Sequence, residues 1–356
     1  MVICMRKKRL IIADINSREI NGKLEGHCVA VAENYLTNFG EIYDVLIAGG
    51  SIYKQYFPDN HFELPYTIDN NNGIVSKLRV FLNGIALLSG AKDSVIVFQQ
   101  SAVTIALFSI ISSFARRNNE VYLIQYNTEY FDCKLKRKLF DLAKKKICGV
   151  ICSDQAIGNK SGMRYCSVPD FIYTGKKKLE EKEKDIDFGI YGYITAGKGV
   201  LEAVQELMKY PCSVKVAGKV GGQDIDIAQA EKINEIKSDR VSCEFGYLSA
   251  EKYWEYMART KYCVLNYQEV YANRGSGVIL DCIYNGIPVV TKRREAVEYI
   301  QKYDMGIVYD DIRDVNFGEV LEDESYEQKK ANIDRYLQNQ HKYVQKLVSF
   351  FEEYSE

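Results

Sequence analysis

Four segments in the second half of the chain carry residues whose types and spacing suit phosphate chemistry. Three place glycine directly after a strand-like run and the fourth places glycines just before a helical pattern, and taken singly each is ordinary turn chemistry. Their fixed order along one half of the chain indicates a single binding site. The segments are Gly192 with Lys198-Gly199, then Ala217-Gly218, then Phe245-Gly246-Tyr247-Leu248, and finally Gly275-Ser276-Gly277-Val278-Ile279-Leu280-Asp281 leading to Gly286–Val290.

The segment from Gly275 to Asp281 is the most specific of the four. Its small residues come just before a helical pattern, where backbone N–H groups and the positive end of the helix dipole attract phosphate. Asp281 stands at the far end of the first helical turn, where a carboxylate accepts hydrogen bonds from a ribose diol. Lys198, at the mouth of the opposite loop, supplies a positive charge to a diphosphate. These residue types predict a site for a nucleoside diphosphate.

The elements that must position these residues are apolar strands alternating with helices. Such near-continuous apolar strands predict parallel sheets that are covered by helices on both faces. A charged run over 174–187 has no apolar face and indicates a solvated linker between two such halves. The clearest strand patterns are RLIIADI, DVLIAGG and VIVFQQ in the first half, and FGIYGYI, SVKVAG and YCVLNY in the second.

The sequence therefore predicts an α/β protein with two doubly wound, Rossmann-like domains and a C-terminal helix. The chain has 356 residues, more than the ~250–300 that a single core usually holds. We place the domains at 1–175 and 176–325, and we expect the helix, 326–356, to pack back toward the first domain. Open α/β sheets bind ligands beyond the carboxyl ends of their strands, so we expect the site in a cleft between the domains.

Composition excludes nucleic acid and a thiolate metal site. The net charge of −1 divides into +5 over 1–175 and −6 over 176–356, which is too mild for nucleic acid but leaves a basic first half that suits an anionic surface. The 10 Cys are scattered and mostly flanked by apolar residues, as reduced buried thiols are. Cys148 and Cys152 lack the second pair or nearby His that a zinc site needs.

No secretion signal or membrane span is predicted. The start, MVICMRKKRL, places its charges after a short apolar run, which is the wrong order for a signal peptide. The uncharged stretch Ser94–Ala115 is interrupted by Gln99-Gln100-Ser101 and is predicted to be a strand followed by a helix. We therefore expect a cytoplasmic protein. The basic helix over 134–146 is either a solvated face or a contact with the anionic inner face of a membrane.

Together the four segments resemble the C-terminal domain of GT-B glycosyltransferases, especially the large retaining group called family 4. The resemblance covers 186–310 well and the first half more loosely, through 10–39 and the CSDQAIGN…CSVPDFI segment. It implies two Rossmann-like domains facing a central cleft, the first on the acceptor side and the second binding a nucleotide sugar. It also implies transfer of a hexose-type sugar with retention of configuration.

The resemblance assigns donor-site residues position by position. It implies that Lys198 contacts the donor diphosphate and that Asp281, the second acid of the family's E-x7-E pattern, binds ribose. Asn273 replaces the first acid of that pattern and is expected to contact the sugar. Tyr193 replaces the Arg that commonly follows the first-strand glycine, and Arg274 would restore a cation near the diphosphate. The backbone amides expected to hold phosphate are those of Ser276, Gly277 and Val278.

In the first half, the loop after the first strand carries glycines that line the sugar in the resembling family. Here Gly22 and Gly26 are the candidates, and His27 either faces the cleft or caps the following helix. The family usually has a further His after a later strand, where this chain has Asn127 and Glu129 instead. We therefore name His27, Asn127 and Glu129 as the catalytic candidates.

Three acids leave alternatives open. If a general base is needed, Glu129 or Asp14 would serve, but in a retaining reaction the leaving phosphate can itself accept the acceptor proton. Glu295, in KRREAVEYI, either contacts the sugar or is simply a favourable acid in a first helical turn.

The expected function is transfer of a sugar from a UDP- or GDP-sugar to a glycan or lipid-linked saccharide, in the synthesis of surface polysaccharide. We expect no cofactor and no metal, because Lys198, Arg274 and the helix terminus would meet the diphosphate charge. The altered residues Asn273 and Tyr193 keep open a catalytically silent GT-B protein that binds glycan or supports a partner. A nucleotide-sugar epimerase is disfavoured, because it would need several acids and His in the cleft and the chain has 3 His.

Overall fold

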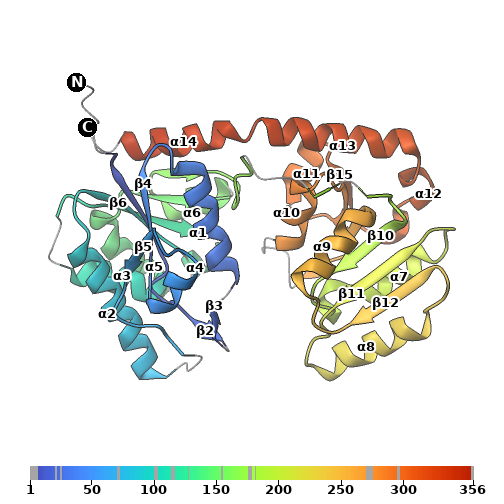
Figure 1. Ribbon diagram of the computed structural model, residues 1–356, viewed down its shortest axis with the longest axis horizontal. Helices are drawn as coiled ribbons and strands as arrows, with labels where there is room; N and C mark the ends of the chain where they lie inside the picture. Colours follow the sequence, from blue (N-terminus) through green and yellow to red (C-terminus); the bar gives the residue numbers. More distant parts are fainter. Residues whose placement is uncertain are drawn as a thin grey trace. The chain divides into compact units, whose positions relative to one another are not determined.

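The computed structural model divides into two compact units. It describes residues 7–20, 22–24, 26–69, 73–99, 103–113, 117–126, 128–153, 155–174, 179–180, 182–269, 276–294 and 297–353. The first unit comprises Met1–Gly175 together with Gln340–Glu356, and the second comprises Lys176–Asn339. Each unit contains its own parallel sheet (Figure 1).

The first unit has a seven-stranded sheet in the order β5-β4-β1-β6-β7-β8-β9, and every neighbouring pair is parallel. The strand order reverses between β1 and β6, the arrangement of a doubly wound fold. A small antiparallel hairpin, β2 with β3, follows β1. The strands are β1 (Arg9–Ala13), β2 (Glu19–Ile20), β3 (Lys23–Leu24), β4 (Asp44–Gly49), β5 (His61–Glu63), β6 (Ser94–Phe98), β7 (Glu120–Gln125), β8 (Gly149–Cys152) and β9 (Tyr165–Ser167).

Helices cover both faces of this sheet because apolar side chains alternate along its strands. In β1, Leu10 and Ile12 belong to one buried cluster, and Ile11 and Ala13 belong to another. Helices α1 and α14 pack on the first cluster, and α2, α3 and α5 pack on the second. The helices are α1 (Gly26–Phe39), η1 (Ser51–Gln55), α2 (Ile74–Gly90), α3 (Val103–Ser112), α4 (Glu129–Asp132), α5 (Lys134–Ala143), η3 (Lys144–Lys146), α6 (Gln155–Ser161) and α14 (His341–Glu352).

The segment that most resembles a membrane span is a strand and a helix, as the sequence predicts. Ser94–Phe98 forms β6, whose five residues are all buried in the sheet, and Val103–Ser112 forms α3, which packs on α2 and α5. Within the described part of the chain, no helix has both the length and the apolar character to cross a membrane.

The second unit has a six-stranded parallel sheet in the order β12-β11-β10-β13-β14-β15. Its order reverses between β10 and β13. The elements are β10 (Ile186–Tyr191), η4 (Ala196–Lys198), α7 (Val200–Leu207), β11 (Val214–Gly218), α8 (Asp224–Glu235), β12 (Val241–Phe245), α9 (Ala250–Arg259), β13 (Thr260–Leu265), α10 (Gly277–Tyr284), β14 (Val289–Lys292), α11 (Glu298–Lys302), β15 (Gly306–Tyr309), η7 (Ile312–Asp314), α12 (Phe317–Val320) and α13 (Asp323–Gln338).

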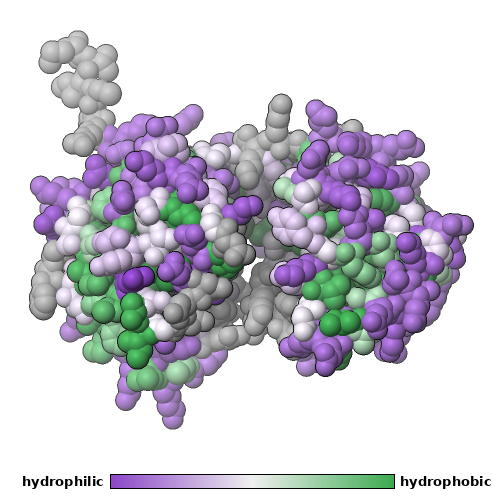
Figure 2. All heavy atoms as spheres, turned by 60° about the horizontal axis from the view of Figure 1, so that its bottom comes forward, coloured by the Kyte–Doolittle hydropathy of each residue, from purple (hydrophilic) through white to green (hydrophobic). Residues whose placement is uncertain are grey.

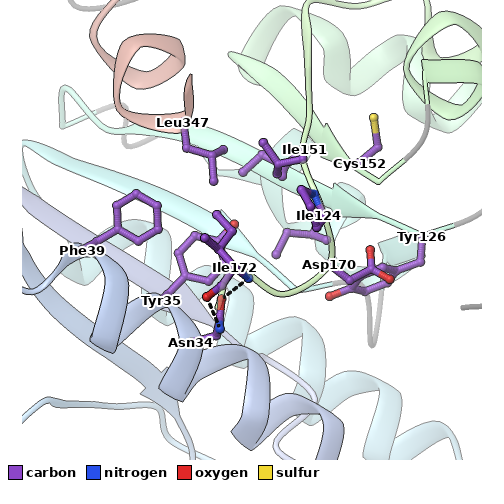
Figure 3. Close-up of a pocket in the computed structure, with 12 residues that line it drawn as sticks. Asn34, Tyr35, Phe39, Ile124, Tyr126, Ile151, Cys152, Asp170, Ile172 and Leu347 are labelled. Atoms are coloured by element: carbon purple, nitrogen blue, oxygen red, sulfur yellow. Dashed lines mark hydrogen bonds between the residues drawn. The ribbon is translucent and has the colours of Figure 1, made fainter. Parts of the chain in front are cut away.

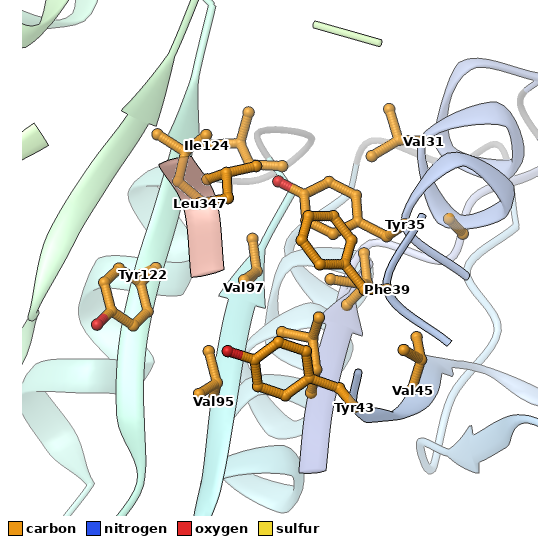
Figure 4. Packing of buried hydrophobic residues seen from close by; sticks show 14 of the residues in the cluster. Val31, Tyr35, Phe39, Tyr43, Val45, Val95, Val97, Tyr122, Ile124 and Leu347 are labelled. Carbon is orange, nitrogen blue, oxygen red and sulfur yellow. The ribbon is translucent and has the colours of Figure 1, made fainter. Parts of the chain in front are cut away.

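The C-terminal segment 326–356 contains most of α13 and all of α14, and these two helices belong to different units. Helix α13 packs within the second unit, where Ile333 is fully buried. Helix α14 packs on the first unit's sheet, where Figure 4 shows Leu347 beside Ile124 and near the stacked rings of Tyr35 and Phe39. The last helix is therefore part of the first unit's core.

Phe351 anchors α14 in this core and is fully buried. Its ring centroid lies 4.9 Å from that of Tyr122 on β7 and 6.3 Å from that of Tyr43 near β4, both in edge-on geometry. We expect Phe351→Ala to lower the free energy of unfolding of the first unit by about 3–5 kcal/mol, through lost burial and a residual cavity. Urea unfolding followed by tyrosine fluorescence measures this loss.

A matched control is Phe108→Ala on α3, because Phe108 is 50% exposed. Its unfolding midpoint should stay close to that of the wild type, since exposed substitutions usually change stability by less than about 0.5 kcal/mol. Equal losses in the two variants would contradict the role given to α14.

Candidate functional site

In the second unit, the loop after β10 meets the start of α10 at the point where the strand order reverses. Gly192 directly follows β10 and has φ +94°, a value that favours glycine. A Cβ at Gly192 would lie 3.4 Å from Lys198 Nζ and 3.5 Å from Val278 Cγ2. These residues therefore gather at the carboxyl edge of the sheet, where open α/β sheets bind ligands.

Backbone contacts fix the loop that carries Lys198. Lys198 ends the short helix η4, and Gly199 follows it with φ +58°. Gln268, just beyond β13, donates its backbone N–H to the Gly197 carbonyl at 2.8 Å. A Cβ at Gly199 would lie 2.4 Å from the Asn266 carbonyl oxygen, so a larger residue would push the loop away from β13. The exit of β13 therefore sets the position of Lys198.

A polar network beneath this loop ties β13 to α7 and β15. Asn266 is 3% exposed, and its amide nitrogen donates to the Gly199 carbonyl at 3.1 Å and to Glu202 Oε2 at 2.8 Å. The Tyr309 hydroxyl donates to Asn266 Oδ1 at 3.0 Å, and Gln268 donates to Glu202 Oε2 at 3.3 Å. Asn266 and Tyr309 are buried while Glu202 is exposed, and their mutual hydrogen bonds hold the loop in place.

Two cations lie over the ring of Tyr267, which follows β13. Lys198 Nζ is 5.3 Å and Arg294 Cζ is 4.7 Å from the ring centroid, both within cation–π range. Burial lowers the pKa of Lys198 to about 8 and also lowers the pKa of Arg294. Electrostatic attraction is stronger in such poorly hydrated surroundings, so this place favours an anion.

The N-terminus of α10 lies beside the same ring. The Tyr267 hydroxyl and Ser276 Oγ are 3.1 Å apart, and Ser276 caps the helix by accepting from the Ile279 backbone N–H at 3.4 Å. Gly277 is exposed, and a Cβ there would meet nothing within 4 Å. The helix start is therefore open on this side, and its positive dipole end adds to the field of the two cations.

Asp281 lies on α10 three residues after Val278, so both side chains project from neighbouring positions on the helix surface. The Tyr253 hydroxyl of α9 donates to Asp281 Oδ2 at 2.8 Å. The ring of Tyr253 stands edge-on to that of Tyr191 at a centroid distance of 6.2 Å. Burial, followed by the nearby Asp281 charge, raises the pKa of Tyr253. Tyr253 therefore remains a hydrogen-bond donor that orients the carboxylate.

The structure brings together one part of the predicted donor site. Lys198, Val278 and the Ser276 cap lie around Gly192 and Tyr267, and Asp281 is one helical turn further along α10. The predicted residues Asn273, Arg274 and Glu295 lie outside the described residues.

Sequence reasoning missed Tyr267, Tyr253 and Arg294. Arg294 comes just after β14, in the run TKRRE. A cation directly beyond the carboxyl end of a buried strand is the signal that could have identified it. Tyr253 and Tyr267 gave no such signal, because tyrosine is frequent in this chain, with 27 residues.

The first-half candidates are described only in part. Gly22, with φ +75°, is the turn of the β2–β3 hairpin. Gly26 and His27 are the first two residues of α1, and Glu129 is the first of α4. Asn127 lies outside the described residues, as do the side chains of His27 and Glu129. Their predicted catalytic and sugar-binding roles therefore remain predictions.

Asp14, the alternative base, is a structural residue in this fold. Its side chain is 2% exposed, and Oδ2 accepts from the Tyr53 hydroxyl at 2.7 Å. Oδ1 accepts from the Asn16 backbone N–H at 3.1 Å, which holds the turn after β1. Ser17, with φ +39°, donates its hydroxyl to the Asp14 carbonyl at 2.7 Å and continues that turn. These contacts fix the loop geometry.

A small cavity of about 20 Å³ lies in the first unit, near the carboxyl ends of β7 and β8 (Figure 3). Asn34 of α1 holds one wall by exchanging hydrogen bonds with the backbone of Ile172, at 2.9 and 3.0 Å. Burial raises the pKa of Asp170, beside Tyr126, to about 6. One water needs at least about 10–15 Å³, so the cavity has room for water but not for a sugar.

No protein-family model matches the chain, and no curated protein matches it. Among solved structures, HepE of Anabaena in complex with UDP has a TM-score of 0.68 at 15% identity, over 98% of this chain and 99% of that one. OtsA in its apo form has a TM-score of 0.67 at 10% identity, over 96% and 98% of the two chains.

A third similar structure is AviGT4, a glycosyltransferase involved in avilamycin A biosynthesis. It has a TM-score of 0.64 at 11% identity, over 97% of both chains. These neighbours have the GT-B fold, and the present chain shares it across nearly its whole length. The predicted GT-B fold class is therefore confirmed.

Anion binding at this site should depend on the charge of Lys198. Since the pKa of Lys198 is lowered to about 8, the ammonium is present below that pH and is lost above it. We expect the ratio of pyrophosphate affinities, wild type over Lys198→Gln, to be largest below pH 7. Above pH 8 it should shrink by up to about tenfold per pH unit. Titration calorimetry at constant ionic strength measures both affinities, and their ratio cancels the titration of pyrophosphate itself.

The matched control is Lys209→Gln, because the Lys209 side chain is 60% exposed and pairs with Glu206. The affinity of Lys209→Gln for pyrophosphate should equal that of the wild type at every pH. A wild-type to Lys198→Gln ratio that does not change between pH 6 and pH 9.5 would refute the assignment.

Proposed function

We propose that the protein is a glycosyltransferase that moves a hexose-type sugar from a UDP- or GDP-sugar to a saccharide or lipid-linked acceptor. The observation that carries this proposal is the grouping of Lys198, Arg294, the Ser276 helix cap and Asp281 at the switch point of the second unit. The grouping offers positive charge for a diphosphate and, next to it, a carboxylate for a ribose diol.

In the proposed reaction, the bond between the anomeric carbon and the diphosphate breaks while the acceptor hydroxyl forms the new glycosidic bond. Negative charge grows on the leaving diphosphate, and Lys198 and Arg294 stabilise it most at that stage. Their surroundings are poorly hydrated, which increases the effect. This charge stabilisation requires no metal ion or cofactor.

Asp281 would bind the ribose of the donor. Tyr253 holds one carboxylate oxygen at 2.8 Å, and this fixes the direction in which the carboxylate presents itself to a diol. The HepE structures contain UDP and UDP-glucose, which supports a uridine nucleotide for this chain as well. Asn273, Glu295, Gly22 and Gly26 remain the residues proposed to contact the transferred sugar.

On the acceptor side, His27, Asn127 and Glu129 are the proposed catalytic residues. Retention of configuration would allow the leaving diphosphate to take the acceptor proton, so that these three residues would orient the hydroxyl. A glycan or lipid-linked saccharide, in the synthesis of surface polysaccharide at the inner face of the membrane, is the proposed acceptor. AviGT4, which shares the fold, is itself a glycosyltransferase of a biosynthetic pathway.

A catalytically silent GT-B protein is the second candidate. Tyr193 stands where the resembling family commonly has Arg, and its side chain is 52% exposed with Lys219 Nζ 5.8 Å from its ring. A silent protein would still bind a nucleotide through Lys198 and Asp281, but it would not transfer a sugar. Measuring nucleotide binding and turnover separately distinguishes the two candidates.

The test is a panel of UDP- and GDP-sugars, assayed for transfer and for donor hydrolysis, with nucleotide affinity measured in parallel. For the preferred donor we expect Lys198→Ala to lower kcat by about 100-fold, as loss of one preorganised charge-stabilising group does. Asp281→Ala should weaken nucleotide binding about tenfold or more, because a charge-assisted hydrogen bond contributes ~1.5–3 kcal/mol. Lys209→Ala should leave both quantities unchanged.

Each result separates the hypotheses. Tight nucleotide binding without turnover on any donor would favour the silent protein. Absence of nucleotide binding in the wild type would refute the site in the second unit.

A further inference from the structure

Helix α2 exposes apolar side chains at positions where a solvent-facing helix normally has polar residues. Ile74 is 86% exposed, Val75 63%, Leu78 54% and Leu82 37%. Their spacing, one turn apart along the helix, places Ile74, Leu78 and Leu82 on one stripe. The opposite side of α2 packs on the sheet through Val80, which is 3% exposed. The helix is therefore apolar on both its buried and its exposed side.

The neighbouring helices extend this surface. Helix α3 packs against α2, where a Cβ on Gly84 would lie 2.3 Å from Ser109 Oγ, and it also packs against α5. On α3 Phe108 is 50% exposed, and on α5 Leu135 is 77% exposed and Leu142 68%. All three helices bury their other sides in one cluster on the same sheet face, so their exposed sides point in a common direction.

We call the exposed side of α2, α3 and α5 the apolar-basic face. Figure 2 shows hydrophobic residues gathered at the lower left of the first unit, where Figure 1 places α2 and α3, with hydrophilic residues around them. The apolar members of the face are Ile74, Val75, Leu78, Leu82, Phe108, Leu135 and Leu142.

Cations accompany these apolar side chains. Helix α2 contains Lys77 and Arg79 and no acid, and α3 contains no charged residue. Helix α5 contains four cations and one acid, Asp141, which forms ion pairs with Arg137 and Lys144. The three helices together therefore carry a net charge of +5. The exposed cations of the face are Lys77, Lys134, Lys136, Lys138 and, just beyond α5, Lys145.

We propose that the apolar-basic face docks on the surface of an anionic lipid bilayer. Apolar side chains with lysines around them suit the boundary between lipid headgroups and acyl chains. The apolar side chains contact the acyl chains, and the lysines contact the anionic headgroups. The proposal does not depend on the proposed activity, since it concerns other residues than the nucleotide site. It extends the contact expected from 134–146 to a surface built mainly on α2.

Charge and apolar character favour an anionic bilayer over two other partners, a second copy of this chain and a nucleic acid. In a symmetric dimer through this face, the same patch would meet itself and bring like charges together. A nucleic acid would neutralise the lysines, but its backbone offers nothing to exposed Ile and Leu, and Phe108 is the one aromatic among the exposed apolar residues of the face. An anionic bilayer matches both the charge and the apolar character.

The test is co-sedimentation of the full chain with vesicles of phosphatidylcholine containing about 30% phosphatidylglycerol, compared with pure phosphatidylcholine. We expect binding to the anionic vesicles and little to the neutral ones, decreasing as salt rises. Lys134→Gln with Lys138→Gln should weaken binding about 25-fold, since each cation near an anionic surface contributes about fivefold. Ile74→Ser with Leu78→Ser should weaken it about tenfold or more.

The matched controls lie on α8 of the second unit. Ile225 is 55% and Ile227 46% exposed there, and their double replacement by Ser should leave vesicle binding unchanged. Circular dichroism of each variant checks that the fold is intact, as expected for exposed positions. Nucleotide binding should also be the same in all variants.

Four outcomes would overturn the proposal. One is equal binding to anionic and neutral vesicles. Another is a loss of vesicle binding in the α8 control variant that equals the loss in Ile74→Ser with Leu78→Ser. The third is a wild-type dimer, seen in analytical ultracentrifugation, that Ile74→Ser with Leu78→Ser dissociates. Binding to a DNA oligonucleotide in preference to vesicles would also refute it.

Discussion

The site in the second unit depends on a close approach between two glycines. A Cβ on Gly218 would lie 1.7 Å from the Gly192 carbonyl oxygen, and Gly218 has φ +153°. No other residue leaves room for the two loops, which follow β10 and β11, to run side by side. Because they do, the Lys198 loop is kept at the carboxyl edge of the sheet. There it faces the exit of β13 and the start of α10.

The fixed position of this loop explains how the charged side chains of Lys198 and Arg294 can remain in poorly hydrated surroundings. Lys198 and Arg294 lie over Tyr267, and burial there lowers the pKa of both cations because it disfavours their charged forms. The polar network of Asn266 and Glu202 holds the loop despite that cost. A site that is rigid before its ligand arrives loses less on binding and can stabilise charge without rearranging.

Much of the architecture could be predicted from the sequence, because it depends on local pattern. The strand β6 and helix α3 follow from an apolar run, a polar interruption and a second apolar run. Lys198 and Asp281 stand out because a cation and an acid flank glycine-rich turns. The contact between Tyr267 and Arg294 could not be predicted, since it joins the ends of strands β13 and β14 and depends on packing across the sheet. The division between α13 and α14 has no breaker such as Pro or Gly at Asn339-Gln340.

The placement of α14 has a consequence for how the chain is made. The first unit consists of two stretches, with the whole of the second unit inserted between them in sequence. A ribosome therefore completes every residue of the second unit before it has produced Phe351, whose ring closes the core against Tyr122. The second unit is complete in sequence before α14 is made, whereas the first must wait for α14 with the part of one sheet face that α1 does not cover still exposed. A chain cut short before α14 would carry that exposed apolar face, and the cell's chaperones and proteases would recognise it.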